Sequence, residues 1–143
     1  MERTRLGNIE NLSIGFTCGA FDLLHAGHIV MLKEAKANCD HLIVGLQTDP
    51  SIDRQKKNTP VQSVFERYIQ LRAVKYIDEI IPYDTEQSLL DLLEATEIHL
   101  RFVGDDYVDR HFTGKGLHEI FYTSRQHSFS STNLRNKINE SSY

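Results

Sequence analysis

Short apolar runs alternate along this chain with longer segments in which apolar residues recur every three or four positions. The runs at 14–18, 41–46, 79–81, 100–103 and 119–122 have the length and composition of buried strands. The segments between them carry the spacing of amphipathic helices. Because strands and helices alternate, we predict a mostly parallel sheet with helices on both of its faces.

The predicted helices connect and follow these strands. The first begins at or just before His28, and Pro82 should stop the third strand. The apolar positions that define the helices are Ile29, Leu32, Ala35 and Cys39 in the first, Val61, Val64, Phe65, Tyr68 and Leu71 in the second, Leu89, Leu92 and Leu93 in the third, and Leu134 and Ile138 in the last.

Composition narrows the class of protein. The 143 residues, 40% hydrophobic and 25% charged, suit one domain over 12–143 after a short extension at 1–11. A formal net charge of −4 argues against a nucleic-acid surface. Two cysteines make no disulfide framework, and the sequence shows neither a signal peptide nor a membrane span. We expect a cytoplasmic enzyme that acts on a small ligand.

Polar clusters follow four of the predicted strands directly. They are the segments 19–28, 47–49, 104–106 and 125–132. In doubly wound sheets, ligands bind beyond the carboxyl ends of the strands, so these clusters should converge at one edge.

The first cluster places two imidazoles where an anion should bind. His25 and His28 lie three residues apart at the start of a helix, whose unpaired N–H groups attract negative charge. Half a metal site and a pair of surface histidines are the alternatives. A zinc site would need more ligands, and Cys18 and Cys39 occupy positions that look internal. The context therefore favours a phosphate.

The last cluster contains three hydroxyl residues in a row, Ser130, Ser131 and Thr132, ahead of the final helix. They could simply cap that helix. The functional interpretation is that the same helix N-terminus receives phosphates, with Arg125 as a fixed cation.

Taken together, the strand, the Gly-Ala-Phe-Asp turn and the His-Ala-Gly-His sequence resemble the cytidylyltransferase branch of the H-x-G-H nucleotidyltransferases. The resemblance is greatest to bacterial glycerol-3-phosphate cytidylyltransferases, over roughly residues 12–139. The last cluster resembles the family motif R-T-x-G-I-S-T-S/T, with Ser128 and Phe129 replacing its glycine and isoleucine. This resemblance implies a single Rossmann-like, doubly wound α/β domain that binds a nucleoside triphosphate.

The resemblance also implies roles for individual residues. His25, His28, Arg125 and either Lys56 or Lys57 would be catalytic, and Arg67, Asp106 and Tyr107 would bind the acceptor. The nucleotide would be bound by Gly19, Ala20, Phe21, Asp22, Gly27, Asp105, Ser130, Ser131 and Thr132. Mg²⁺ would be held mainly by the triphosphate, without a dedicated protein metal site. Relatives form homodimers, and aromatic surface near Tyr68 and Tyr76 could serve that purpose.

The implied reaction is transfer of CMP from CTP to a small acceptor resembling glycerol 3-phosphate. The altered Ser128-Phe129 loop leaves open another acceptor, such as an amino-acid phosphate. The segments 21–28 and 59–61 also resemble the adenylyltransferase domain that activates heptose 1-phosphate, so ATP and a sugar phosphate form a second pair. A module that binds nucleotide without catalysis is the remaining alternative.

Overall fold

The computed structural model describes residues 12–54, 57, 59–124 and 131–141. Five strands form one sheet in the order β3-β2-β1-β4-β5, and every pairing in it is parallel. The strands are β1 (Ile14–Gly19), β2 (His41–Gln47), β3 (Glu79–Tyr83), β4 (Leu100–Gly104) and β5 (Glu119–Thr123). The doubly wound parallel sheet predicted from the alternating pattern is confirmed.

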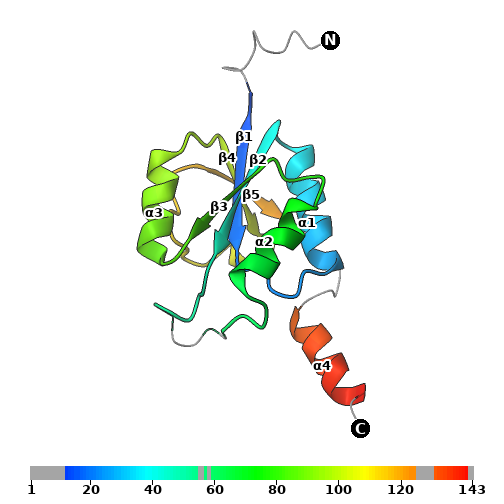
Figure 1. Ribbon diagram of the computed structural model, residues 1–143. Helices are drawn as coiled ribbons and strands as arrows, with labels where there is room; N and C mark the ends of the chain where they lie inside the picture. The colour runs from blue at the N-terminus through cyan, green and yellow to red at the C-terminus, as the bar shows by residue number, and fades with distance from the viewer. Residues whose placement is uncertain (1–11, 55–56, 58, 125–130, 142–143) are drawn as a thin grey trace.

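Helices cover both faces of this sheet (Figure 1). Helices α1 (Ala26–Ala37) and α2 (Val64–Arg72) lie on one face, and α3 (Glu86–Ala95) lies on the other. The last helix, α4 (Ser131–Ser141), lies beyond the carboxyl ends of the strands. A single 3₁₀ turn, Asp105–Tyr107, follows β4 directly.

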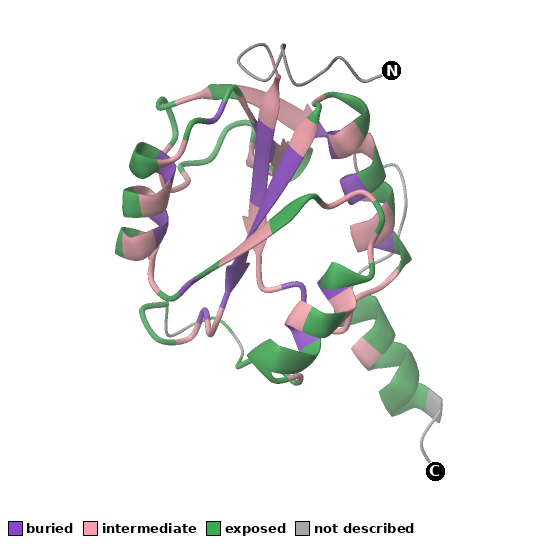
Figure 2. Cartoon of the chain, turned by 45° about the horizontal axis from the view of Figure 1, so that its top comes forward, coloured by how far each residue is buried: buried purple, intermediate pink, exposed green. Residues whose placement is uncertain are grey.

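The apolar core is divided by the sheet into two layers, and the central strands are its most buried part (Figure 2). On the side of α1 and α2, Leu32, Leu46 and Phe102 belong to one cluster. On the side of α3, Phe16 and Leu93 belong to the other. The central strands are buried on both faces, which explains why they are continuous apolar runs rather than alternating ones.

Side chains of the preceding residues fix where α2 and α3 begin. Ser63 accepts a hydrogen bond from the Glu66 N–H at 3.1 Å, and the Glu66 carboxylate accepts one from the Ser63 N–H at 2.9 Å. Thr85 and Ser88 make the same reciprocal arrangement at α3. These capping boxes satisfy backbone donors that have no partner within the helix.

Two details of the sequence prediction are wrong. Pro82 does not stop the third strand but pairs with Leu46 inside β3, which is an edge strand and so tolerates a missing donor. The predicted apolar stripe of α2 faces the core only in part. Tyr68 and Leu71 pack in the core, whereas Val64 and Phe65 are exposed and Arg67 is buried instead.

The predicted dimer surface also differs from expectation. Tyr68 and Tyr76 are half-buried and pack against the core, so they offer little free aromatic surface. Helix α2 exposes Phe65 and Ile69 instead. The homodimer itself stays a prediction.

Candidate active site

A cavity of about 810 Å³ opens at the carboxyl ends of the strands, where the strand order reverses between β1 and β4. This is the place where doubly wound sheets bind their ligands. Three of the four predicted polar clusters line it, represented by His28, Gln47 and Gly104. The convergence of these clusters is therefore confirmed, whereas residues 125–130 of the fourth lie outside the described part of the chain.

The two histidines form one rigid unit at the start of α1. Their rings stack with centroids 3.9 Å apart and planes 29° apart. The Gly27 N–H donates to Nδ1 of His25 at 2.9 Å, and the His25 N–H donates to Nδ1 of His28 at 3.1 Å. Because each Nδ1 accepts a backbone proton, each neutral ring carries its own proton on Nε2. The pair thus presents two Nε2–H donors from side chains that line the cavity.

The helix start explains this geometry. Helix α1 begins at Ala26, with His25 as its N-cap, so it starts two residues earlier than His28. The His25 side chain caps the helix, a role that serine or aspartate more often fills. His28 completes a capping box from the third helical position. The same backbone bonds that start the helix therefore fix the tautomer of both rings.

Burial keeps His28 neutral. Burial in the fold, reinforced by repulsion from His25 and opposed by Asp22, lowers the pKa of His28 to about 4. The Phe21 ring lies 5.4 Å from the His28 ring and forms part of this apolar surrounding. At neutral pH, His28 is a hydrogen-bond donor without a full charge.

The loop between β1 and α1 is held by residues of unusual conformation and by Asp22. Phe21 and Leu23 adopt φ values of 51° and 52°, a left-handed region that costs energy for residues with a side chain. The Asp22 carboxylate accepts from the N–H groups of Val61 and Gln62, at 2.8 and 3.0 Å. Asp22 lines the cavity as predicted, but its oxygens hold this loop against the start of α2.

Arg67 does not bind the acceptor as predicted, because its guanidinium is used inside the protein. The side chain is 1% exposed, and it donates to the backbone carbonyls of four residues. These carbonyls belong to Ala20, Gln47, Thr48 and Gln62. Arg67 thus joins the ends of β1 and β2 to α2, and it positions the loops of the cavity rather than a ligand.

Cations from two segments outside the sheet line the cavity. Arg54 and Lys57 come from the connection after β2, and Lys56 lies outside the described residues. Arg135 of α4 also lines it and donates to Asp22 at 2.8 Å. Sequence reasoning missed Arg54 and Arg135 as site residues, although Arg135 lies in the first turns of α4, shortly after the hydroxyl run. Cationic side chains around a cavity favour an anionic ligand.

The remaining predicted residues differ in whether they line the cavity. Asp106 and Tyr107 line the cavity, whereas Asp105 does not, and its role in nucleotide binding stays a prediction. Gly19, Ala20, Phe21 and Gly27 also contribute to the lining. Helix α4 begins at Ser131, and Thr132 is exposed and does not line the cavity. Arg125 and Ser130 lie outside the described residues.

Cys18 is an internal position of β1, as predicted, and it also lines the cavity. Burial raises the pKa of its thiol, and Arg101 opposes that shift. A protonated thiol is a poor nucleophile, so the site favours chemistry without a covalent protein intermediate.

The described residues offer neither a cluster of metal ligands nor a helix that could span a membrane. They contain no group of three or more histidine, cysteine, aspartate or glutamate side chains arranged to hold a metal ion. Within the same ranges, no helix combines the length and apolarity needed to cross a membrane.

In this doubly wound sheet, paired imidazoles and cations lie where the strand order reverses. That arrangement is typical of an α/β domain that binds phosphate groups. Residues 16–137 match the family model described as cytidylyltransferase-like, and the chain belongs to that family.

Curated relatives are similar over most of this chain but are much longer. The bifunctional protein HldE of Caulobacter sp. (strain K31) is 44% identical over 99 residues, which cover 68% of this chain and 20% of that protein. The bifunctional protein HldE of Bradyrhizobium sp. (strain ORS 278) is 37% identical over 119 residues, which cover 82% and 24%. The chain thus matches about a fifth to a quarter of their length.

Solved structures share the fold. The lipopolysaccharide core biosynthesis protein from Thermoplasma volcanium GSS1 aligns with a TM-score of 0.59 and 23% identity, over 90% of this chain and 88% of that chain. The pantoate-beta-alanine ligase from Francisella tularensis aligns with a TM-score of 0.56 and 19% identity, over 92% and 72%. At these identities the likeness concerns architecture alone.

Proposed function

We propose that this protein transfers a nucleotidyl group from a nucleoside triphosphate to a small phosphorylated acceptor. The observation that carries the proposal is the paired histidines, whose Nε2–H donors lie together at the N-terminus of α1. Two preorganised donors at a helix N-terminus suit phosphate oxygens that gain charge during a displacement.

The proposed reaction is a single in-line displacement. A phosphate oxygen of the acceptor attacks the α-phosphorus, the bond to the bridging oxygen breaks, and pyrophosphate leaves with that electron pair. The product is a nucleoside diphosphate linked to the acceptor. Such a transfer depends on positioning and charge stabilisation, so no protein nucleophile is needed.

The residues of the cavity divide this work. His25 and His28 donate to the α- and β-phosphate oxygens, and their stabilisation grows as charge develops there. Arg54, Lys57 and Arg135 surround the remaining phosphates and the leaving pyrophosphate. Arg125, one of Lys56 and Lys57, and the hydroxyl run 130–132 keep their predicted roles in this proposal.

Mg²⁺ fits a cavity that is lined by carboxylates, among them that of Asp106. Asp106 lines the cavity beside β4, and Mg²⁺ typically takes one or two carboxylates together with phosphate oxygens. When bound, the ion would neutralise charge on the triphosphate.

ATP and a sugar phosphate are the first pair of substrates that we propose. The segments 21–28 and 59–61 resemble an adenylyltransferase domain that activates heptose 1-phosphate, and both relatives described above are HldE proteins. CTP with glycerol 3-phosphate or an amino-acid phosphate is the second candidate, favoured by the cytidylyltransferase-like family model.

The test is pyrophosphate release with Mg²⁺, crossing ATP, CTP, GTP and UTP with phosphorylated acceptors. Glucose 1-phosphate, heptose 1-phosphate, glycerol 3-phosphate and phosphoserine represent the acceptor classes. Release with one nucleotide and one acceptor supports the proposal and names the pair. Nucleotide binding by titration, without release for any acceptor, would instead support a module that only binds nucleotide.

A further inference from the structure

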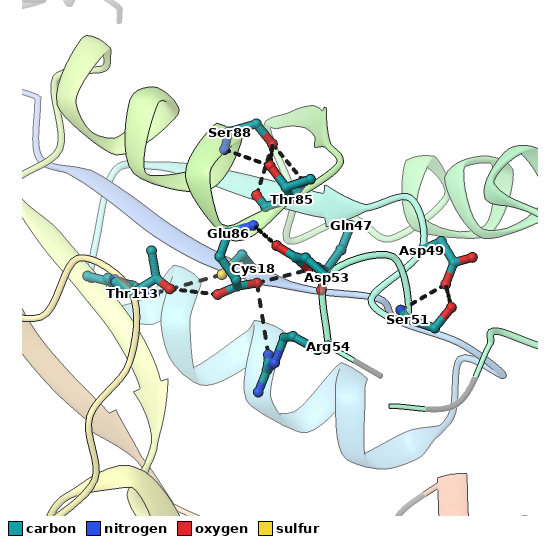
Figure 3. Close-up of polar contacts among 11 residues, drawn as sticks. Cys18, Gln47, Asp49, Ser51, Asp53, Arg54, Thr85, Glu86, Ser88 and Thr113 are labelled. Carbon is teal, nitrogen blue, oxygen red and sulfur yellow. Dashed lines mark hydrogen bonds and ion pairs between the residues drawn. The ribbon is translucent and has the colours of Figure 1, made fainter. Parts of the chain in front are cut away.

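A second polar cluster lies on the α3 side of the cavity, away from the histidines. Its members, which we call the acceptor cluster, are Gln47 of β2, Glu86 of α3, Arg101 of β4 and Thr113 of the β4–β5 connection. All four line the cavity, and only Gln47, in the segment 47–49, was singled out by its position in the sequence. Figure 3 shows the Glu86 carboxylate between the side chains of Gln47 and Thr113.

Hydrogen bonds hold the Glu86 carboxylate in one place. Thr113 Oγ1 donates to Glu86 Oε1 at 2.6 Å, and Gln47 Nε2 donates to Glu86 Oε2 at 3.4 Å. Arg54 Nη1 lies 3.9 Å from the same Oε2. The carboxylate is half-buried and accepts only two hydrogen bonds from these partners, whereas a carboxylate has about four acceptor positions.

Arg101 is unusual because it is a buried cation in the middle of a strand. It is 4% exposed, and its Nε is buried without a hydrogen-bond partner among the described residues. One Nη group donates to the Thr113 carbonyl, and the other lies 3.9 Å from Cys18 Sγ. No carboxylate of the described ranges forms an ion pair with it. A buried guanidinium in this state has unused donor capacity, which a ligand can satisfy.

The β4–β5 connection is built closely over this arginine. Gly114 has a φ of +80°, and a Cβ there would lie 2.9 Å from Arg101 Nη1 and 2.5 Å from Leu93 Cδ1. The centroid of the Phe112 ring lies 4.9 Å from the guanidinium carbon of Arg101 and forms a second contact with it. The arginine is therefore fixed in position by its surroundings and cannot easily turn toward solvent.

We propose that the acceptor cluster binds the hydroxyl groups of a sugar or polyol phosphate, which rests on the nucleotidyl transfer proposed above. A hydroxyl both donates and accepts, so adjacent hydroxyls can donate to the Glu86 carboxylate and accept from Arg101 and Gln47. The fixed carboxylate disfavours an acceptor whose non-reacting end is anionic, because like charges would meet in the cavity. Phe112 offers an apolar ring for the carbon face of such an acceptor.

The test compares hydroxyl-rich and hydroxyl-free acceptors in Glu86→Gln. Glucose 1-phosphate and glycerol 3-phosphate are the hydroxyl-rich probes, propyl phosphate is the hydroxyl-free probe, and phosphoserine carries a second anion. We expect the substitution to raise KM for the hydroxyl-rich probes by about tenfold or more and to leave KM for propyl phosphate unchanged. The Kd for ATP, measured by titration without acceptor, should change less than about twofold. Glu94→Gln, an exposed carboxylate on the same helix, is the matched control.

The outcomes separate the two proposals. Failure of both ATP and CTP to bind the unmodified protein would overturn the nucleotidyl transfer and, with it, the acceptor cluster. Nucleotide binding with equal KM values for glycerol 3-phosphate in the protein and in Glu86→Gln would overturn the acceptor cluster alone. Turnover of phosphoserine but of neither hydroxyl-rich probe would also overturn it. Glu86→Gln keeps the shape of the side chain, so we expect the variant to fold and the comparison of KM values to be decisive.

Discussion

The backbone N–H of His25 donates to Nδ1 of His28 at 3.1 Å, and the two rings stack 3.9 Å apart. This contact joins the start of a helix to the chemistry of the site. The bonds that cap α1 also set the Nε2–H tautomer of both rings, so the donors that we propose for catalysis are preorganised by the fold itself.

Asparagine substitutions separate the capping of α1 from the donation of a hydrogen bond at Nε2. In His28→Asn, Oδ1 can take the place of Nδ1 and accept the His25 N–H, but the donor at Nε2 is lost. We expect kcat to fall about 10²–10³-fold. The apparent Tm should change by only a few degrees, since asparagine also serves as a cap.

His25→Asn separates capping from hydrogen-bond donation at the N-cap itself. The control is His41→Asn, because His41 lies at the start of β2 and does not line the cavity. Pyrophosphate release and thermal unfolding are the two measurements. A normal kcat in either cavity variant would contradict the assignment of that imidazole to the transition state.

The low pKa of His28 makes stability depend on pH. In the unfolded chain His28 takes up a proton near pH 6.5, whereas in the folded protein it does so only near pH 4. Between these values the unfolded state binds more protons, so the free energy of unfolding falls as the pH drops from about 6.5 to about 4. The contribution present above pH 6.5 is at most about 3 kcal/mol.

Urea unfolding near pH 7, 5.5 and 4 measures this dependence. His118, whose pKa is also lowered by burial, acts in the same direction, so the comparison must be made with His28→Asn. The variant should lose less stability between pH 7 and pH 4 than the unmodified protein. Parallel curves for the two proteins would show that His28 is not the titrating group.

Arg67 should matter for stability, not for acceptor recognition. Arg67→Lys keeps a positive charge but cannot reach the carbonyls of Ala20, Gln47 and Thr48 together. We expect a loss of about 3 kcal/mol or more and a fall in Tm of about 10 °C. Arg72→Lys, on the exposed side of α2, should leave Tm nearly unchanged. An unchanged Tm with a selectively raised acceptor KM would restore the phosphate-binding role.

The exposed face of α2 is where we expect the homodimer to form. Phe65 is 69% exposed and Ile69 is 51% exposed, on the same side of one helix. Phe65→Glu should convert a dimer to a monomer, as measured by light scattering after size-exclusion chromatography. Glu94→Gln, on the opposite layer, should leave the mass unchanged. A dimer that survives Phe65→Glu would place the interface elsewhere.

How much of this could be predicted from sequence differs from residue to residue. The apolar runs and the Gly-rich turn predicted the sheet, the cavity edge and His25 and His28, because local patterns determine strands and helix starts. The positions of Arg67 and Arg101 could not be predicted in this way. Their roles depend on carbonyls and side chains distant in sequence, and an arginine in a helix or strand shows no local sign of burial. Pattern alone therefore missed the buried cations and misassigned the face of α2.

A pair of glycines tests whether the β4–β5 connection must lie close to Arg101. Gly114 and Gly116 both have positive φ, at +80° and +100°, so alanine strains the backbone at either position. Only at Gly114 would the new Cβ meet Arg101 and Leu93, since nothing lies within 4 Å of the corresponding position at Gly116. Gly116→Ala therefore measures the backbone cost alone, about 1 kcal/mol or somewhat more. Gly114→Ala should add a further loss of stability and raise KM for glycerol 3-phosphate, because Arg101 must shift. Equal effects of the two substitutions on Tm and KM would show that the connection is free to move away from the arginine.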